Sequence, residues 1–283
     1  MKLASFTLSG RRSWGVVTGD VIADLGAVGP ATLKLALAQP GGLDAIRSAA
    51  AGAARIALAD VMLDPVLPDP DKILCVGLNY ENHRKETGRD VVEHPTIFAR
   101  FANSQIGHAA PLIRPACSTH LDFEGELAVV IGTPGRHISR DNAFGHVAGY
   151  ACYNDGSVRD WQRHTIQFTP GKNFMGTGAF GPWLVTPDEV GPLADLKLQT
   201  RLNGQVVQDT RIGDMIFDIP TIIAYCSTFT RLEIGDVIVT GTPGGVGAKR
   251  NPPLWMKPGD VVEVEIDRVG LLRNPVVVEP SRR

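Results

Sequence analysis

Strand-like segments dominate the chain after residue 66, and helical segments do not alternate with them. Val, Ile, Leu and aromatic residues are concentrated in "KILCVGL", "PTIFAR", "FEGELAVVIG", "HVAGYACYND", "LKLQTRLNGQVVQ", "DVIVTGT" and "DVVEVEID". The Asn203-Gly204 dipeptide predicts a tight hairpin in the fifth segment. A doubly wound α/β fold needs alternating strands and helices, so the pattern instead predicts a β-rich α+β domain.

The first 66 residues have a different pattern. "KLASFTL" and "RRSWGVVTGDVIADL" predict short strands, and residues 31–60 predict an Ala/Leu-rich helix broken at Pro40-Gly41-Gly42. The proline-rich "LDPVLPDPDK" that follows is typical of a linker. We therefore expect a small N-terminal α/β cap domain at residues 1–66 and a larger domain at residues 67–283. The clearest helix of the larger domain is predicted to begin near Asp218 and Pro220.

Composition excludes several classes of function. The formal net charge of −2 in 283 residues gives no basic surface for nucleic acid. No apolar run has membrane-spanning length, and the first residues lack the apolar region of a secretory signal, so we expect a cytoplasmic protein without membrane contact. The four cysteines form no CxxC pair, which predicts reduced thiols packed as small apolar residues.

Two acids interrupt an otherwise apolar segment, "HLDFEGELAVVIG" at residues 120–132, which is read as one strand. Glu124 and Glu126 are two positions apart, so both carboxylates point to the same face and repel each other. Protonation, a basic partner or a bound cation would relieve this repulsion. Asp155, at the end of another strand-like run, adds a third acid and favours an all-oxygen site for Mg²⁺ or Mn²⁺. An exposed strand face produces the same Glu-x-Glu spacing, so spacing alone leaves both interpretations open.

Two further pairs have the spacing of helix neighbours. Arg159 and Gln162 would lie on one face of a helical turn, where a guanidinium group suits a carboxylate or enolate oxygen; a surface salt bridge with Asp160 is the alternative. His83 and Glu86 could form a pair in which the carboxylate fixes the imidazole tautomer; a solvated helix is the alternative.

The segments "VGLNYENHRKE", "FEGELAVVIG", "GYACYNDGSVRDWQ", "GKNFMGTGAFGPWLV" and "VIVTGTPGGVG", taken in this order, closely resemble the fumarylacetoacetate hydrolase family over residues 71 to 267. The resemblance implies a mixed β-roll with a small N-terminal domain, and a homodimer. It also implies a divalent metal held by Glu124, Glu126 and Asp155. One departure is "DGSVRDWQ": after the Asp the family commonly reads Val-Ser/Thr-Ala-Arg-Asp, whereas this chain has Gly156 and Val158 at the first and third of these positions. The metal-binding Asp and the Arg keep their places, and the glycine adds backbone freedom beside a ligand.

The resemblance also assigns roles to residues around the metal. It implies that His83 and Glu86 activate water from a mobile lid, and that Lys172 stabilises developing negative charge. Substrate binding falls to four residues: Tyr80, Arg159, Gln162 and Thr242.

The function expected from this set is metal-dependent hydrolysis of a carbon–carbon bond in an acylpyruvate-type (2,4-dioxo acid) substrate, releasing pyruvate or a related 2-oxo acid. Two alternatives use the same site: tautomerisation of a hydroxymuconate-type dienoate, and decarboxylation of a β-keto acid such as oxaloacetate. A scaffold that had lost catalysis would be expected to lack an acid or the lysine. All of them are present, so an enzyme acting on a small oxo acid is favoured.

Overall fold

The computed structural model describes residues 1–280 and is strand-rich, which confirms the expected α+β class. Within these residues, twelve strands join in one large sheet. Along its path the order is β4 (Arg55–Ala57), β3 (Val21–Asp24), β2 (Arg11–Thr18), β1 (Lys2–Leu8), β14 (Gly178–Val185), β12 (Val147–Asp155), β11 (Gly125–Ile131), β17 (Val237–Val239), β6 (Ile73–Gly77) and β7 (Thr96–Arg100). Two short strands pair beside this path, β5 (Met62–Leu63) with β1 and β8 (Gln105–Ile106) with β14.

A second sheet packs on the large one and completes the roll. Its order is β16 (Gln205–Arg211), β15 (Lys197–Leu202), β18 (Val261–Ile266), β19 (Gly270–Val278) and β9 (Leu112–Arg114). Leu127 and Val129 of β11 share a buried cluster with Leu198 of β15 and Val264 of β18. Ala128 and Val130, on the other face of β11, join a second buried cluster. Both faces of β11 are therefore covered, which explains its continuous apolar run.

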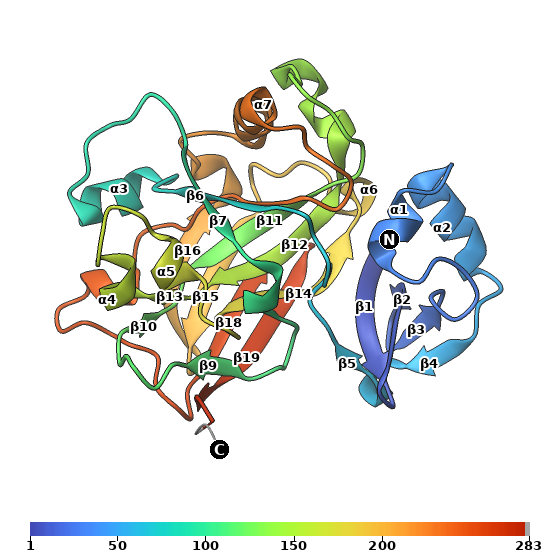
Figure 1. Cartoon of the computed structure of the whole chain (residues 1–283), viewed down its shortest axis with the longest axis horizontal. Coiled ribbons are helices and arrows are strands. Elements are labelled where there is room, and N and C mark those ends of the chain that lie inside the picture. Colours follow the sequence, from blue (N-terminus) through green and yellow to red (C-terminus); the bar gives the residue numbers. More distant parts are fainter. Residues whose placement is uncertain (281–283) are drawn as a thin grey trace.

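Helices are short and lie at the edges of the sheets. They are α1 (Leu33–Leu37), α2 (Gly42–Ala50), α3 (Glu81–Thr87), α4 (Arg159–Gln162), α5 (Thr169–Lys172), α6 (Pro187–Val190) and α7 (Ile219–Phe229), with 3₁₀ turns η1 (Leu58–Asp60), η2 (Ala102–Ser104), η3 (Arg140–His146), η4 (Ile212–Asp214) and η5 (Gly247–Lys249). Figure 1 shows α3, α4 and α5 together on the side of the roll that faces away from the N-terminal elements. Among the described residues, no helix has both the length and the apolar character needed to cross a membrane.

The predicted hairpin and the predicted long helix are confirmed. Asn203 and Gly204 both have positive φ, 52° and 78°, as a type I′ turn requires. Helix α7 follows Asp218, whose side chain accepts a hydrogen bond from the Thr221 N–H.

Three local predictions were wrong. Residues 55–57 form strand β4 rather than helix, because Val21 and Ala57 pair across β3 and β4. Residues 120–132 are not one strand: β10 (Leu121–Asp122) pairs with β13 (Ser157–Val158), the chain breaks at 123–124, and β11 then pairs with β12. Among the cysteines, all free, Cys117 is exposed, whereas the other three are buried as expected.

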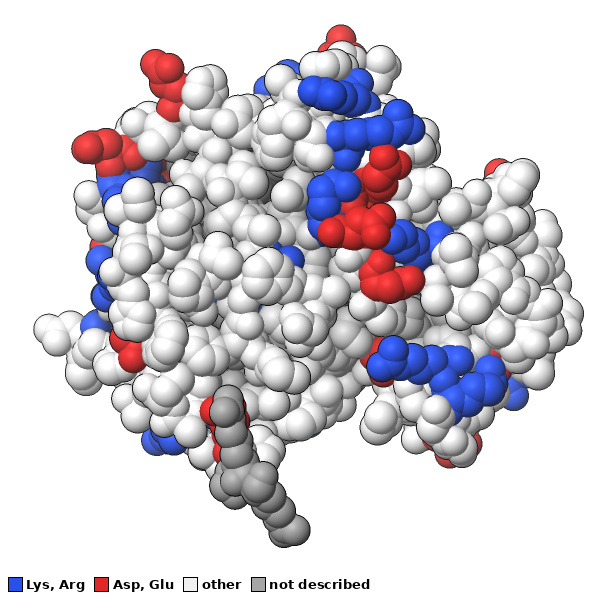
Figure 2. Space-filling model, viewed as in Figure 1, with Lys and Arg blue, Asp and Glu red and all other residues white. Residues whose placement is uncertain are grey.

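The N-terminal elements are joined to the roll by backbone pairing and by charge. Strand β1 pairs with β14, with Lys2 opposite Val185. Figure 2 shows basic and acidic side chains interspersed along the boundary between the two parts. Arg47 of α2 contacts Asp188 of α6 at 2.9 Å across this boundary.

Candidate active site

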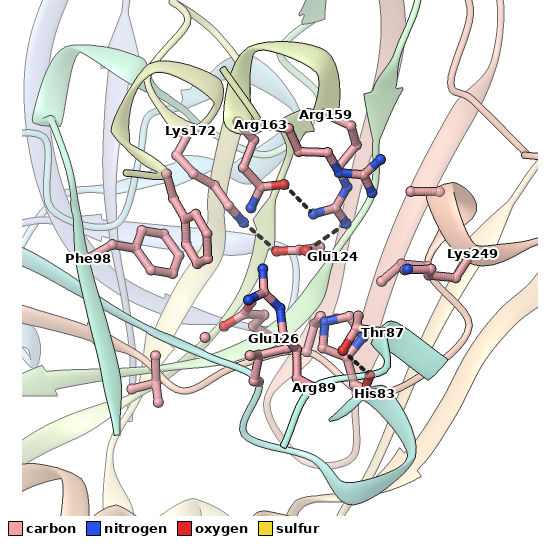
Figure 3. Close-up of a pocket in the computed structure, with 18 residues that line it drawn as sticks. His83, Thr87, Arg89, Phe98, Glu124, Glu126, Arg159, Arg163, Lys172 and Lys249 are labelled. Atoms are coloured by element: carbon pink, nitrogen blue, oxygen red, sulfur yellow. Dashed lines mark hydrogen bonds and ion pairs between the residues drawn. The ribbon is translucent and has the colours of Figure 1, made fainter. Parts of the chain in front are cut away.

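A cavity of about 170 Å³ lies where α3, α4, α5 and the segment after β17 meet (Figure 3). Apart from α4 and α5, which are neighbours in the chain, these elements are far apart in sequence, and each contributes polar side chains to the cavity wall. The lining includes His83, Glu124, Glu126, Gln162, Lys172 and Thr242. Most of the residues predicted from sequence to form the site are thus brought together.

The three predicted metal ligands form one buried cluster. Each of Glu124, Glu126 and Asp155 offers a carboxylate oxygen, and these oxygens lie within 4.8 Å of one another. Antiparallel pairing of β11 with β12 produces this arrangement, because the Asp155 N–H donates to the Glu124 carbonyl at 2.9 Å. Since all three side chains are buried, the alternative of an exposed Glu-x-Glu face is excluded.

Basic side chains compensate two of the three acids. The Lys172 ammonium contacts Glu124 and lies 2.6 Å from Asp155 Oδ2, while Arg159 Nη2 is 2.7 Å from Glu124 Oε1. Arg100, completely buried, pairs with the other oxygen of Asp155. Burial would lower the pKa of Lys172, but the charges of Asp155 and Glu124 outweigh burial and raise it, so this lysine stays protonated.

The acids differ in how well they are compensated. Burial would raise the pKa of Glu124, but Arg159 and Lys172 outweigh burial and lower this pKa to about 2. Burial raises the pKa of Glu126, and the carboxylates of Asp155 and Glu124 raise it further. Within residues 1–280, Glu126 has no ion-pair partner, and a single backbone N–H, that of Gly241, bonds to it. The cluster therefore offers only oxygen ligands, and no basic side chain of the described residues compensates the Glu126 carboxylate. Such a cluster fits a divalent cation such as Mg²⁺ or Mn²⁺.

Backbone amides of the glycine-rich segment after β17 hold the acids in place. Gly241 N–H donates to Glu126, Gly245 N–H to Glu86 Oε2 at 2.9 Å, and Gly247 N–H to Asp122 Oδ1 at 2.8 Å. Gly241 has φ +103°, and a Cβ there would lie 2.7 Å from the Asn79 Cβ. This position therefore requires glycine, and the segment supports the site through its backbone.

His83 and Glu86 form the pair that their spacing predicts. Both lie on α3, and His83 Nδ1 is 2.7 Å from Glu86 Oε1. His83 is buried and lines the same cavity as Glu124 and Glu126. With its Nδ1–H donated to Glu86, the ring keeps Nε2 as a proton acceptor.

The predicted substrate-binding residues are placed differently from one another. Arg159 and Gln162 share one face of α4, but the three guanidinium nitrogens donate to Asp122, Glu124 and Gln162. Figure 3 shows Arg159 bonded to Glu124 in the cavity wall. Arg159 thus primarily positions Glu124. Gln162 uses its oxygen for Arg159, which leaves its amide N–H groups for a ligand.

The hydroxyl groups of Thr242 and Tyr80 are less available for substrate binding than the Gln162 amide. The Thr242 hydroxyl donates to the Gly125 carbonyl and accepts from Gln208, although its side chain lines the cavity. Tyr80 is fully buried outside the cavity lining, and its hydroxyl has no hydrogen-bond partner among the described residues. The substrate-binding role assigned to Tyr80 stays a prediction that its position does not favour.

Gly156 does not loosen the ligand segment. It is buried, its carbonyl accepts a hydrogen bond from Arg100 Nη1 at 3.0 Å, and an added Cβ would lie 2.2 Å from the Thr177 carbonyl oxygen. The expectation of extra freedom at this position was therefore wrong, because tight packing fixes the glycine.

Comparison with known proteins identifies the family. The sequence model of the family described as fumarylacetoacetate (FAA) hydrolase C-terminal matches residues 72–277. The chain belongs to the fumarylacetoacetate hydrolase family. The resemblance read from the sequence motifs is confirmed.

Relatives of the chain are enzymes of more than one reaction type. Over 210 residues it is 45% identical to oxaloacetate tautomerase FAHD2A, mitochondrial, of Homo sapiens, an alignment that covers 74% of this chain and 67% of that protein. A fumarylacetoacetate hydrolase from Exiguobacterium antarcticum superposes with a TM-score of 0.88 at 36% identity, covering 99% of this chain and 100% of that chain. Maleylpyruvate hydrolase from Sphingobium, in complex with manganese(II) and pyruvate, superposes with a TM-score of 0.83 at 32% identity and the same coverage.

Two supporting residues of this family member were not found from sequence. Asp122 accepts hydrogen bonds from Arg159 and from the backbone of Gly247 and Ala248, and Arg100 pairs with Asp155. The alternation Asp122, Glu124, Glu126 was a usable signal for the first. A lone arginine at the end of "PTIFAR" gave no signal for the second.

Proposed function

We propose that this family member transfers a proton at the carbon next to the carbonyl of a 2-oxo acid, that is, that it is a keto–enol tautomerase of the oxaloacetate type. The observation that carries this proposal is that His83, held at Nδ1 by Glu86, lines the same cavity as Glu124 and Glu126. The 45% identity to an oxaloacetate tautomerase supports it.

Glu124, Glu126 and Asp155 would hold Mg²⁺ or Mn²⁺, which when bound supplies Lewis-acid polarisation of the 2-oxo group. The Gln162 amide nitrogen donates to the substrate carboxylate, because its oxygen is already bonded to Arg159. The protonated Lys172 ammonium stabilises negative charge as it develops on the substrate oxygen.

Proton transfer is assigned to His83. Its Nε2 accepts a proton from C3 of the keto form, and the imidazolium is stabilised by Glu86 at Nδ1. The same proton returns to the substrate oxygen to give the enol, so no water or co-reactant is consumed. The reverse sequence converts enol to keto.

The test follows the ultraviolet absorbance of enol-oxaloacetate with purified protein, in Mn²⁺ and in EDTA. His83→Ala should lower the tautomerisation rate by about 10²–10⁴-fold, the usual contribution of general acid–base catalysis. His137→Ala, on an exposed side chain, is the matched control and should retain the parent rate. A parent protein that is no faster than Mn²⁺ alone would disprove the proposal.

Hydrolysis of an acylpyruvate is the second candidate, favoured by the likeness to a maleylpyruvate hydrolase structure that contains manganese and pyruvate. Here His83 would take a proton from water, whose oxygen bonds to C4. The C3–C4 bond then breaks, and C3 receives a proton, giving pyruvate and a carboxylic acid. Pyruvate release from maleylpyruvate separates this reaction from tautomerisation, which releases nothing, and carbon dioxide release from oxaloacetate would indicate decarboxylation.

A further inference from the structure

The chain leaves β6 toward α3 through a residue with an unusual backbone. Leu78 directly follows β6 and has φ +60°, a left-handed conformation that non-glycine residues rarely adopt. Among residues 1–280, six non-glycine residues have positive φ, and Leu78 is the one that lines the cavity. Backbone strain of this kind persists only where the surrounding structure holds it, and it is concentrated at functional sites.

The next residue, Asn79, is completely buried and is bonded through both ends of its amide. Its Nδ2 donates to the Thr240 carbonyl at 2.7 Å and to the Phe217 carbonyl at 3.0 Å, while its Oδ1 accepts from the Phe217 N–H at 2.8 Å. The Asn79 carbonyl also accepts from the Ile216 N–H at 2.8 Å. This residue thus ties the start of the α3 segment to the end of β17 and to the segment before α7.

The direction of α3 depends on such contacts outside the helix. The helix has seven residues, and its N-cap side chain makes no capping hydrogen bond, so it is too short to be stable by itself. Further along, Asn82 Oδ1 accepts from the Gly244 N–H at 3.0 Å, and Glu86 Oε2 accepts from the Gly245 N–H at 2.9 Å. His83 lies between these two contacts in the sequence and lines the cavity (Figure 3).

The segment that anchors Asn79 also holds one of the acids. Thr240 precedes Gly241, whose N–H donates to Glu126, and an added Cβ at Gly241 would lie 2.7 Å from the Asn79 Cβ. Asn79 therefore places the helix that carries His83 relative to the same stretch of backbone that supports Glu126. A change in this contact would move the histidine relative to the acids.

We propose that Leu78 and Asn79 form a pivot that sets the direction of α3 and so positions His83 against Glu124 and Glu126. The positive φ of Leu78 turns the chain out of β6, and the hydrogen bonds of Asn79 hold that turn in place. Both are positioning residues that act through α3. The link to proton transfer rests on the proposed function, whereas the placement of α3 can be measured without turnover.

Amide exchange in D₂O, followed by NMR on Mg²⁺-loaded protein, is the first test. In Asn79→Ala, the Gly244 and Gly245 amides should exchange about five- to tenfold faster relative to the Gly247 amide, the effect of losing one hydrogen bond. The acceptors of the first two amides lie on α3, whereas the acceptor of Gly247 is Asp122 of β10. An unchanged exchange ratio in a folded Asn79→Ala protein would overturn the pivot.

Asn274→Ala is the matched control for this variant. Asn274 is also buried, and its Nδ2 donates to two backbone carbonyls, those of Gly107 at 2.9 Å and Ala110 at 2.8 Å. It does not line the cavity. The control should destabilise the fold but leave the exchange ratio of Gly244 to Gly247 within about twofold of the parent, since general destabilisation raises the exchange of all three glycine amides. The same rise in this ratio as in Asn79→Ala would reduce Asn79 to a structural role.

Two substitutions at Leu78 decide the question even where Asn79→Ala does not fold. Leu78→Gly permits either sign of φ, so α3 should lose its fixed direction and the Gly244 exchange ratio should rise about fivefold. Leu78→Asn introduces a residue type that tolerates positive φ, and this ratio should stay near that of the parent. Because both variants remove the leucine side chain from the cavity wall, equal ratios in the two would overturn the role assigned to the backbone of Leu78.

Turnover of enol-oxaloacetate then connects the direction of α3 to the chemistry. Asn79→Ala and Leu78→Gly should each lower kcat by about 10- to 10²-fold, the usual effect of misplacing a reacting group, while Asn274→Ala should stay within about twofold of the parent. A raised exchange ratio with an unchanged kcat would overturn the positioning of His83 by the pivot. A raised ratio in a protein whose parent catalyses no tautomerisation would instead overturn the proposed function and keep the control of α3 by the pivot.

Discussion

The buried charges of the site depend on one another residue by residue. Asp155 is compensated by Arg100 and Lys172, Glu124 by Arg159 and Lys172, and Glu126 by no basic side chain in the described part of the chain. A buried ion pair that loses one member leaves an uncompensated charge in a poorly solvating environment. Substitutions here therefore change stability as well as chemistry, and the two effects need separate measurements.

Arg100→Met tests this dependence away from the substrate. Arg100 is 2% exposed and does not line the cavity, so its removal should act on the groups that it bonds, Asp155 above all, and not on the substrate directly. We expect a loss of about 3–5 kcal/mol in the free energy of unfolding, measured by urea denaturation, because Asp155 and the Gly156 carbonyl lose their partner. The control Arg231→Met removes an exposed pair with Glu233 and should cost less than about 1 kcal/mol. Similar losses of unfolding free energy in both variants would contradict the role of Arg100 as the buried partner that compensates Asp155.

Gly241 and Gly204 allow backbone strain to be separated from crowding. Both have positive φ, but a Cβ at Gly204 meets no atom within 4 Å, whereas one at Gly241 meets Asn79 and Val76 below 3 Å. Gly204→Ala should cost about 1–2 kcal/mol for the left-handed backbone alone. Gly241→Ala should cost more, and should also weaken Mn²⁺ binding in calorimetry, because its N–H holds Glu126. Equal stability costs with unchanged Mn²⁺ affinity would show that Gly241 is not a support of the site.

The site could be predicted where chemistry follows from short spacing. Glu124 and Glu126 are two residues apart, and His83 and Glu86 are three apart, so strand and helix geometry bring each pair together. Arg100 could not be predicted, because its contact with Asp155 depends on how β7 and β12 pack in three dimensions.

At the scale of elements, the local sequence was sufficient to predict a helix or strand where the element contains its own turn or capping residues. Strands β15 and β16 with their Asn-Gly turn, and α7 with its Asp218 cap, are of this kind. Residues 55–57 were misread because alanine-rich sequence favours helix, while pairing with β3 outweighs that preference. The break at 123–124 was also missed because it depends on strand pairing. Strands β10 and β11 pair with different partners, which composition does not reveal.

Asp24, at the end of β3, links this strand to β2 and makes their pairing pH-dependent. Burial would raise its pKa, but hydrogen bonds from Ser13 and Arg11 outweigh burial and lower the pKa below the usual 3.8. A lowered folded-state pKa contributes stability that is present above the unfolded value and is lost as the pH falls through the folded value. Asp24→Asn should therefore destabilise the protein by about 1–2 kcal/mol at pH 7, and this difference should shrink as the pH falls below 3.8.

The measurement is the midpoint of thermal unfolding of both proteins between pH 3 and pH 7, reported as a difference so that other acids cancel. Asp20→Asn, on an exposed side chain of the same hairpin, serves as the control and should follow the parent at every pH. A parent–variant difference that is constant across this range would mean that Asp24 acts through shape and not through charge.

At the scale of the whole molecule, the N-terminal segment and the roll share one sheet and one buried cluster. Leu3 and Trp14 pack in the same cluster as Val130, Tyr153 and Phe180 of the roll. Strand β1 also covers the edge of β14, which would otherwise expose unpaired backbone groups. The chemistry lies on the far side of the roll from these contacts (Figure 1), so the N-terminal segment influences the site through the stability of the sheet.

This shared core predicts that residues 1–66 and 67–283 unfold together. Differential scanning calorimetry of the full chain should show a single transition whose calorimetric and van't Hoff enthalpies agree, because neither part can lose the common cluster without exposing apolar surface of the other. Expression of residues 67–283 alone should give an aggregating protein, since deletion uncovers the β14 edge together with Phe180 and Leu184. Two separate transitions, or a monodisperse fragment with parent-like Mn²⁺ binding, would show instead that the boundary near residue 66 separates independently stable domains.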